Sequence, residues 1–256
     1  MEKNQEKIIS VRNLIKKYDE LTAVDNISFD IYKGEIFGLL GPNGAGKTST
    51  MEIMETLREA TSGEIIIDGL SVNKNVEQVK QIIGVQLQQS GFYPHLNLTE
   101  LIHLFEGLYN VKADVNEILE LVDLKEKGKT AYNKLSGGQK QRFSIATTLI
   151  NKPKIIFLDE PSTGLDPQAR RNLWELIEHI RDTGTTIMIT THYMDEAEKL
   201  CDRVGIIDTG KIIAIDSPNG LIDNLIQSGF KKPEQVKQAS LEDVFLNLTG
   251  RELRDE

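Results

Sequence analysis

The sequence predicts an α/β fold in which helices cover a parallel β-sheet. Over most of its 256 residues, short apolar runs with the character of strands alternate with segments of helical periodicity. A glycine-rich loop, GPNGAGKT at 41–48, lies between one such run and a helical segment. The order of strand, loop and helix is typical of phosphate-binding loops. The chain is long enough to bury a full core as one globular unit with subdomains.

The first part of the chain contains predicted strands on both sides of this loop. The strands before it are KIISVRNLIKKY at 7–18, NISFDIY at 26–32 and EIFGLLG at 35–41. Apolar and polar residues alternate in the second of them, which predicts a half-buried strand. After the loop, TSTMEIMETLREA at 48–60 has apolar residues at helical spacing and contains no Gly or Pro. GEIIIDG at 63–69 and QIIGVQLQ at 81–88 predict two further strands.

The middle of the chain is predicted to be a helical subdomain over about 95–150. Helical periodicity runs from Leu98 to Ile150. Three segments, separated by polar or glycine-containing links, are expected to form helices. They are LTELIHLFEGLY, DVNEILELVDL and GGQKQRFSIATTLI.

Strand and helix alternation returns after this subdomain. The successive segments are KIIFLDE at 154–160, RNLWELIEHIRD at 171–182, TTIMITTH at 185–192, DEAEKLC at 195–201 and VGIID at 204–208. Their order is that of a parallel sheet covered by helices. We therefore expect residues 1–216 to form the main unit and residues 217–256 to form a short C-terminal extension.

The C-terminal extension is expected to be helical. Ser240 is followed three residues later by Asp243, a spacing that resembles a capping box. Four apolar residues fall on one helical face, and they are Leu241, Val244, Phe245 and Leu248. Such a face either packs back on its own domain or docks a partner, and both interpretations stay open.

Composition and charge exclude several classes of protein. The one cysteine, Cys201, excludes an internal disulfide and a zinc-type cysteine cluster, which fits a reducing compartment, and we expect a cytoplasmic protein. The first ten residues, MEKNQEKIIS, are charged and lack the apolar core of a signal peptide, and no apolar run is long enough to cross a bilayer. A formal net charge of -9 argues against broad nucleic-acid binding, which needs a basic face.

The glycine-rich loop matches the Walker A pattern, in which backbone N–H groups close around phosphates at a helix N-terminus. Lys47 is expected to contact the β- and γ-phosphates of a nucleoside triphosphate, and Thr48 is expected to offer its hydroxyl to Mg²⁺. The expected nucleotide-binding residues of this segment are Gly41, Pro42, Asn43, Gly44, Ala45, Gly46, Lys47, Thr48 and Ser49.

Two carboxylates follow the apolar run IIFL at 155–158. Parallel sheets place their ligands at the carboxyl ends of the strands. We expect Asp159 to hold Mg²⁺ and Glu160 to act as the general base that polarises the attacking water. His192 follows the strand TTIMITT, which is expected in the same sheet, so its imidazole would orient water or the γ-phosphate. The alternatives are solvated carboxylates and a structural histidine.

A second glycine-containing motif, LSGGQ at 135–139, opens a predicted helix. Together with the Walker A loop and the two carboxylates, it resembles the signature of the ATP-binding-cassette (ABC) ATPases, the nucleotide-binding subunits of ABC transporters. The resemblance covers almost the whole chain. It implies a P-loop NTPase (RecA-like) core, an N-terminal antiparallel β subdomain and an α-helical subdomain. It also implies that ATP and Mg²⁺ are the cofactors.

Further residues match the motifs of that family. Tyr18 matches the aromatic residue that stacks on adenine. Gln88 matches the Q-loop glutamine, a catalytic residue and metal ligand, with Gln86 and Gln89 as alternatives in register. Asp166 ends the motif TGLD, which matches the D-loop of the family.

The resemblance also explains why one chain carries two phosphate cradles. In this family two subunits face each other head to tail, and each ATP lies between Walker A of one subunit and the signature of the other. The residues expected to contact the partner's nucleotide are Ser136, Gly137, Gly138 and Gln139. His192 matches the switch histidine of the chain's own site. The implied partners are a second copy, in an ATP-dependent homodimer, and a separate transmembrane permease that holds the chain at the inner face of the cell membrane.

Two other stretches resemble one branch of the family. TTHYMDEAEKLCDRVGIIDTGKI at 190–212 and SLEDVFLNLTGREL at 240–253 look like the ATPase chains of bacterial exporters for drugs, lipids or polysaccharides. The hypothesis is an exporter ATPase whose membrane subunit is another polypeptide. One alternative is a soluble ABC ATPase acting on ribosomes or DNA. Such proteins usually carry a second cassette, a coiled coil or zinc-binding cysteines, and this sequence shows none of these. A GTPase switch is unsupported, because NKPK at 151–154 has Lys154 where the guanine motif requires Asp.

Overall fold

The computed structural model describes residues 6–86 and 91–230. The chain divides into two units, Met1–Leu221 and Ile222–Glu256. The described strands all belong to the first unit, and α8 (Pro218–Gln227) continues from the first unit into the second. The helix predicted around residues 240–248 lies outside the described residues. No helix in the described part of the chain combines the length and the apolar character needed to cross a bilayer.

An antiparallel sheet forms the N-terminal subdomain, with the strand order β2-β1-β4-β5. Its strands are β1 (Lys7–Tyr18), β2 (Leu21–Tyr32), β4 (Ser62–Ile67) and β5 (Leu70–Ser71). The long β1–β2 hairpin turns at Asp19, whose φ of 47° lies in the left-handed region that Asp tolerates in tight turns. The strand predicted over 26–32 is confirmed as the second half of β2.

The second sheet of the described residues has the order β10-β9-β3-β8-β7-β6. Its strands are β3 (Ile36–Leu40), β6 (Ile83–Gln86), β7 (Ile155–Asp159), β8 (Thr186–Thr191), β9 (Arg203–Asp208) and β10 (Lys211–Asp216). Neighbouring strands are parallel, as predicted, except that β10 runs antiparallel to β9. Every residue of β3, β7 and β8 is buried, because both faces of the sheet are covered.

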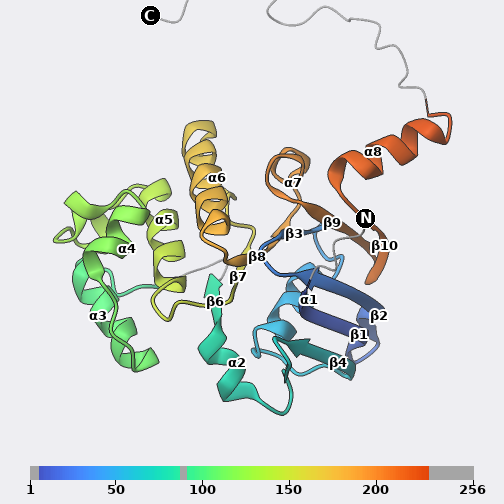
Figure 1. Cartoon of the computed structure of the whole chain (residues 1–256), viewed down its shortest axis with the longest axis horizontal. Helices are drawn as coiled ribbons and strands as arrows, with labels where there is room; N and C mark the ends of the chain where they lie inside the picture. The colour runs from blue at the N-terminus through green and yellow to red at the C-terminus, as the bar shows by residue number, and fades with distance from the viewer. Residues whose placement is uncertain (1–5, 87–90, 231–256) are drawn as a thin grey trace, which may run out of the picture. The chain divides into compact units, whose positions relative to one another are not determined.

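Alternate residues of the central strands enter two separate hydrophobic cores. Ile36 and Ile156 belong to one core, whereas Phe37 and Phe157 belong to the other. The helices that contribute to the first core include α5 (Gly137–Thr148), α6 (Pro167–Asp182) and α7 (Met194–Leu200). The antiparallel sheet and α1 (Lys47–Met54) contribute to the second. Figure 1 shows α6 and α7 on one side of the parallel sheet and α1 on the other.

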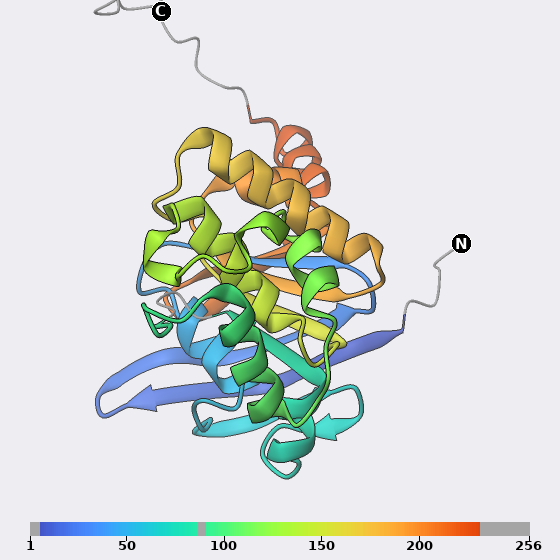
Figure 2. The same ribbon diagram turned by 90° about the vertical axis from the view of Figure 1, so that its left-hand side faces the viewer.

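A group of helices follows β6, where helical periodicity predicted it. It contains α3 (Leu98–Tyr109), α4 (Val115–Leu121) and α5, which lie side by side in Figure 2. A capping box starts α3, because the Glu100 N–H donates to Asn97 Oδ1 at 3.0 Å and the Asn97 N–H donates to Glu100 Oε2 at 2.9 Å. The ring of Phe92 packs against Phe143 of α5, with 5.4 Å between the ring centroids.

Two predicted elements differ in extent from the structure. The helix predicted over 48–60 stops with α1, because Thr56 takes a left-handed conformation with φ of 64°, which does not continue a helix. The strand predicted over 81–88 begins only at Ile83, because the short helix α2 (Val76–Ile82) precedes it. The last two predicted residues of that strand lie outside the described residues.

A buried hydrogen bond joins α6 to α7. Trp174 Nε1 donates to Glu196 Oε1 at 3.1 Å, and the side chain of Glu196 is fully buried. Trp174→Phe keeps most of the ring and removes this donor, so a buried carboxylate oxygen loses its partner. We expect the free energy of unfolding to fall by about 2 kcal/mol in urea denaturation. Tyr93→Phe, at an exposed ring, is the control, and equal stability of the two variants would contradict the assignment.

Candidate nucleotide-binding and hydrolysis site

The Walker A segment connects β3 to α1 at the carboxyl end of the parallel sheet, as predicted. Two of its glycines are required by space. A Cβ on Gly41 would lie 2.2 Å from the carbonyl oxygen of Ile207, and a Cβ on Gly46 would lie 2.3 Å from that of Ala23. Gly46 also has φ of 102° and is the N-cap of α1, so the unpaired N–H groups of the first helical turn are available to an anion.

A cavity of about 400 Å³ opens beside this segment. Its lining residues come from the N-terminal hairpin, the Walker A segment and the end of β7, and they are Tyr18, Leu21, Ala23, Asn43, Gly44, Gly46, Lys47, Thr48, Ser49 and Glu160. Tyr18 is the last residue of β1, and its hydroxyl lies 3.4 Å from Ser49 Oγ. The structure therefore brings Tyr18 to the cavity that the Walker A segment lines.

Lys47 is buried at the start of α1, with 4% of its surface exposed. Its ammonium donates to the carbonyl oxygens of Gly41 at 2.8 Å and Pro42 at 3.1 Å. Glu160 Oε1 lies 3.7 Å from the same nitrogen. The ammonium thus lies among oxygen acceptors inside the loop, where a phosphate oxygen would make a stronger, charge-assisted hydrogen bond.

Asp159 ends β7, and its buried carboxylate accepts a hydrogen bond from the hydroxyl of Thr190 on β8. Burial raises the pKa of Asp159 above its ordinary value, and the negative charges of Glu160 and Glu52 raise it further. A divalent cation would relieve this repulsion. Thr48 lines the cavity, and its hydroxyl and the carboxylate are oxygen ligands of the kind that Mg²⁺ prefers. These residues fit a magnesium ion.

Glu160 lies just beyond β7, with φ of 46°. Its N–H donates to both the carbonyl oxygen and the hydroxyl of Thr190, each at 3.1 Å, which holds this left-handed conformation. Its carboxylate is 3.1 Å from His192 Nδ1, in addition to its approach to Lys47. The site therefore combines a carboxylate, an imidazole and an ammonium beside a phosphate-binding loop.

Strand register explains why Glu160 and His192 meet beside the Walker A loop. Asp159 lies opposite Thr190 on β8, and Leu40 at the end of β3 lies opposite Thr191. The three parallel strands therefore end at the same level, and the residues that follow them are Gly41, Glu160 and His192. The structure thus brings these three segments together at one edge of the sheet, as the sequence predicted.

Thr190 is a site residue that was not among the predicted ones. It is fully buried and contacts both Asp159 and the backbone of Glu160. Its signal in the sequence is the threonine pair that follows the apolar residues IMI in TTIMITT, since a buried hydroxyl requires a hydrogen-bond partner. Its partner was not predictable, because the register between β7 and β8 decides it.

The LSGGQ motif begins α5, as predicted. Ser136 is its N-cap: the hydroxyl accepts from the Gln139 N–H at 3.3 Å, and the Gln139 side chain accepts from the Ser136 N–H at 3.0 Å. Ser136 and Gly137 are exposed. The described residues that line the cavity beside Walker A include none from 135–139, so this helix start presents its N–H groups elsewhere.

Asp166 is the N-cap of α6 and accepts from the N–H groups of Gln168 at 3.0 Å and Ala169 at 2.9 Å. Ala169 is also the nearest neighbour of Gly138, where a Cβ would meet the Ala169 Cβ at 3.0 Å. The D-loop helix and the signature helix therefore touch at their first turns. Gln88 and the alternative Gln89 lie outside the described residues, while Gln86 ends β6 and is buried.

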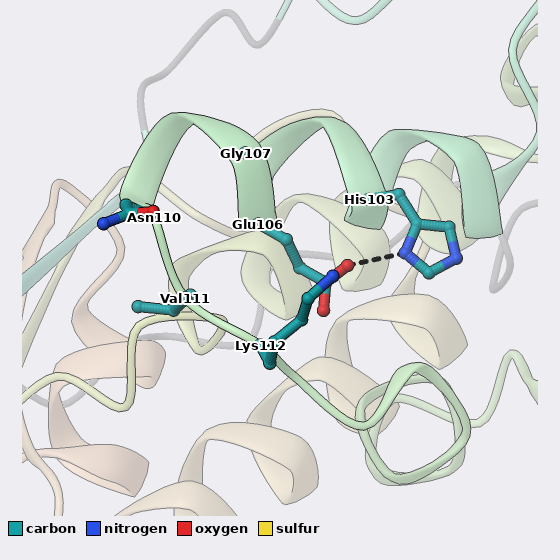
Figure 3. Close-up of a pocket in the computed structure, with 6 residues that line it drawn as sticks. All are labelled: His103, Glu106, Gly107, Asn110, Val111 and Lys112. Carbon is teal, nitrogen blue, oxygen red and sulfur yellow. Dashed lines mark hydrogen bonds and ion pairs between the residues drawn. The ribbon is translucent and has the colours of Figure 1, made fainter.

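Another cavity, of about 390 Å³, lies at the C-terminal end of α3 (Figure 3). It is lined by His103, Glu106, Gly107, Asn110, Val111 and Lys112. The buried Glu106 accepts from the Ala113 N–H at 2.7 Å and contacts His103 Nδ1 at 2.6 Å, and these contacts lower the pKa of Glu106. The Glu106 carboxylate therefore links α3 to the segment that follows it, and both of its oxygens already have partners in His103 and Ala113.

A buried carboxyl also follows α1. Glu55 is 3% exposed, and its Oε1 has no hydrogen-bond partner among the described residues. Burial raises the pKa of Glu55 from 4.5 to about 8, and the charges of Asp159 and Glu52 contribute to the shift. The neutral, protonated carboxyl is thus the form that the fold favours at neutral pH.

Glu55 is expected to make stability fall as pH rises. Between pH 4.5 and about 8 the folded state keeps a proton that the unfolded chain has released, so the free energy of unfolding decreases through this range. Glu55→Gln should remove that decrease and raise the free energy of unfolding by on the order of 4 kcal/mol at pH 8, with little change at pH 4.5. Urea denaturation in EDTA without nucleotide measures it. The control is Glu59→Gln at an exposed position, and identical pH profiles for all three proteins would refute the assignment.

Comparison with known proteins identifies the family. Residues 24–163 match the sequence model of the ABC transporter family. The linearmycin resistance ATP-binding protein LnrL of Bacillus subtilis (strain 168) is 40% identical over 223 residues, which cover 85% of this chain and 72% of LnrL. The Nod factor export ATP-binding protein I of Burkholderia orbicola (strain AU 1054) is 34% identical, and the match covers 96% of this chain and 98% of that protein.

A solved structure shares the fold. The dimeric post-hydrolysis state of the ATP-binding cassette MJ0796, bound to ADP and Pi, superposes with a TM-score of 0.72 at 27% identity, covering 82% of this chain and 98% of that one. The segment that matches the family model contains the Walker A loop, the LSGGQ motif and both carboxylates at the end of β7. The chain belongs to the ABC transporter family, in which it is an ATP-binding subunit and an ATPase.

Proposed function

We propose that this chain binds ATP with Mg²⁺ in the cavity beside residues 41–49 and hydrolyses it to drive export through a separate transmembrane subunit. The observation that carries the proposal is the convergence on Glu160, whose carboxylate lies 3.1 Å from His192 and 3.7 Å from Lys47. A carboxylate in that position can polarise a water molecule next to a phosphate held by the loop.

Adenine and the phosphates of ATP each have a counterpart in the cavity. The ring of Tyr18 stacks on adenine, and the Walker A backbone with Lys47 holds the phosphates. Thr48 and Asp159 would hold Mg²⁺, and the family resemblance implies Gln88 as a further ligand of the ion. When bound, Mg²⁺ neutralises charge on the β- and γ-phosphate oxygens.

The hydrolytic step is assigned to side chains at the strand ends. Glu160 accepts the proton of the attacking water as the water oxygen bonds to the γ-phosphorus, while the bond from that phosphorus to the β–γ bridging oxygen breaks and ADP leaves. His192, beside Glu160, donates a hydrogen bond to the γ-phosphate and fixes the position of the water. Lys47 stabilises the negative charge that develops on the leaving phosphate oxygens.

Each site is completed by a second copy of the chain. Ser136, Gly137, Gly138 and Gln139 form a helix start, exposed at its first two residues, that lines no part of the chain's own cavity, which supports a role on the partner's nucleotide. Asp166 caps the helix next to it and belongs to the same surface. Hydrolysis removes the γ-phosphate shared by the two copies, so the dimer loosens and the attached membrane subunit moves.

The relatives support an exporter. Among them are proteins named for linearmycin resistance and for Nod factor export. Relatives of this kind are ATP-binding proteins of transporters, and such a subunit works beside a transmembrane component. The chain accordingly sits at the inner face of the cell membrane, bound to a permease.

A detergent pull-down tests the transport function. The chain is tagged in its native cells and captured after mild solubilisation, and co-purifying proteins are identified by mass spectrometry. A polytopic membrane protein in stoichiometric amount is expected, and it should be missing when an unrelated cytoplasmic protein carries the tag. Ribosomal proteins or nucleic acid without a membrane partner would overturn the transport function and leave the ATPase chemistry intact.

A further inference from the structure

One arginine connects the D-loop helix α6 to the start of α7. The guanidinium carbon of Arg170 lies 5.5 Å from the centroid of the Trp174 ring and 5.8 Å from that of the Tyr193 ring. Its Nη1 is 3.4 Å from Asp195 Oδ2. The guanidinium therefore contacts two aromatic rings and one carboxylate, which come from two different helices and the turn between β8 and α7.

Tyr193 also contacts His192, which lies beside Glu160. The rings of His192 and Tyr193 have centroids 4.1 Å apart, with an angle of 37° between their planes. The Tyr193 N–H donates to the hydroxyl of Thr191 at 3.0 Å, which fixes the turn that carries both rings. On its other side, His192 lies 3.1 Å from Glu160. An unbroken row of contacts thus runs from Arg170 through the two rings to Glu160.

The other end of the row lies one helical turn from the D-loop. The Arg170 N–H donates to the carbonyl oxygen of Asp166 at 3.0 Å, within the turn that Asp166 caps. Trp174, one turn further along α6, makes the buried hydrogen bond to Glu196 of α7. Two separate contacts, the ion pair of Arg170 and the hydrogen bond of Trp174, therefore join the first half of α6 to α7.

The ion pair alone does not account for this arrangement. Asp195 is 57% exposed, and exposed ion pairs contribute little to stability because water screens them. The Arg170 side chain is only 26% exposed and has its guanidinium near two ring faces, a contact that a planar, weakly hydrated cation makes and a lysine ammonium replaces poorly. The contact constrains the ring of Tyr193 and, through it, the ring of His192.

We propose that Arg170 is a positioning residue that, through Tyr193, holds the His192 ring against Glu160 and links it to the helix that begins at Asp166. The proposal rests on the function assigned above to His192. Arg170 contacts no reacting atom in this assignment. Its contribution is to keep the imidazole in one orientation when the D-loop contacts the second copy of the chain.

Steady-state kinetics on the full chain test the proposal. Arg170→Ala should lower kcat for ATP about tenfold, with KM and the thermal unfolding midpoint close to wild type. The kcat of Arg170→Lys should lie between those of the wild type and Arg170→Ala, because lysine keeps the charge near Asp195 and loses the planar contact. Arg171→Ala is the matched control, since this exposed neighbour bonds Gln168 within α6 and should keep wild-type kcat.

A double-mutant comparison separates positioning from a general loss of structure. If Arg170 acts through His192, Arg170→Ala should reduce kcat no further in a His192→Ala background. An additional tenfold loss in that background would overturn the proposal.

NMR observes the predicted effect on the ring itself. The chain has four histidines, and His192→Gln assigns the ring signal of His192. Arg170→Ala should shift this signal, because it changes the position of the imidazole over the Tyr193 ring, and Arg171→Ala should not. An unshifted signal with wild-type kcat in Arg170→Ala, while His192→Ala is impaired, would refute the role of Arg170 and leave the proposed function standing. Wild-type kcat in His192→Ala would instead remove the assigned function of His192.

Discussion

Glu160→Gln is expected to lower the ATP turnover number by at least about 100-fold while ATP binding stays near wild type. The substitution preserves the size of the side chain and removes the basic oxygen. Glutamine at this position can still fill the space beside Lys47 and His192, so the cavity keeps its shape. The two effects separate because, in the proposed mechanism, the loop binds the γ-phosphate, whereas proton transfer requires the carboxylate.

Phosphate release under saturating ATP and Mg²⁺ measures turnover, and a fluorescent ATP analogue measures binding. Glu64→Gln, the same chemical change at an exposed position on β4, is the control and should leave both quantities unchanged. Hydrolysis at the wild-type rate in Glu160→Gln would remove the general-base assignment. Loss of binding together with turnover would indicate that Glu160 holds the nucleotide rather than activating water.

Lys47→Ala is expected to weaken ATP binding by roughly 10- to 100-fold, the loss that one or two charge-assisted hydrogen bonds represent. In the structure its ammonium donates to two carbonyl oxygens of the loop. Phosphate oxygens replace these acceptors when ATP enters, and alanine offers no donor to them. The side chain is buried, so thermal unfolding must first establish that the variant is folded.

Equilibrium titration with a fluorescent ATP analogue measures this affinity. Lys74→Ala, at an exposed position before α2, is the matched control and should bind ATP like the wild type. Unchanged affinity in Lys47→Ala would show that the phosphates bind elsewhere, and with it the placement of the whole site would be wrong.

The strands of the parallel sheet and the phosphate-binding loop could be predicted from the sequence, because both depend on local patterns. Continuous apolar runs such as IIFL mark strands buried on both faces, and glycine spacing marks the loop. The meeting of Glu160 and His192 followed from the same pattern, since parallel strands end at a common edge.

Features that depend on long-range pairing could not be predicted. The antiparallel strand β10 has no clear alternation, and the helix α2 has only 7 residues, too few for its helical spacing to stand out from the strand that follows. Thr190 gains its role from strand register, and Glu55 from burial beside other carboxylates. The contacts of Arg170 with Tyr193 and Asp195 join residues more than twenty positions apart, and nothing in either local segment indicates them.

In the proposed dimer, each ATP is enclosed by the cavity of one copy and the LSGGQ motif of another. Light scattering during size-exclusion chromatography of Glu160→Gln tests this arrangement, since this variant should keep its ATP. The expected result is the mass of two chains with ATP and Mg²⁺, and the mass of one chain without ATP. One chain is expected under all conditions when Ser136→Arg is added to place a bulky cation in the signature. A dimer that forms without ATP, or that survives Ser136→Arg, would contradict the claim.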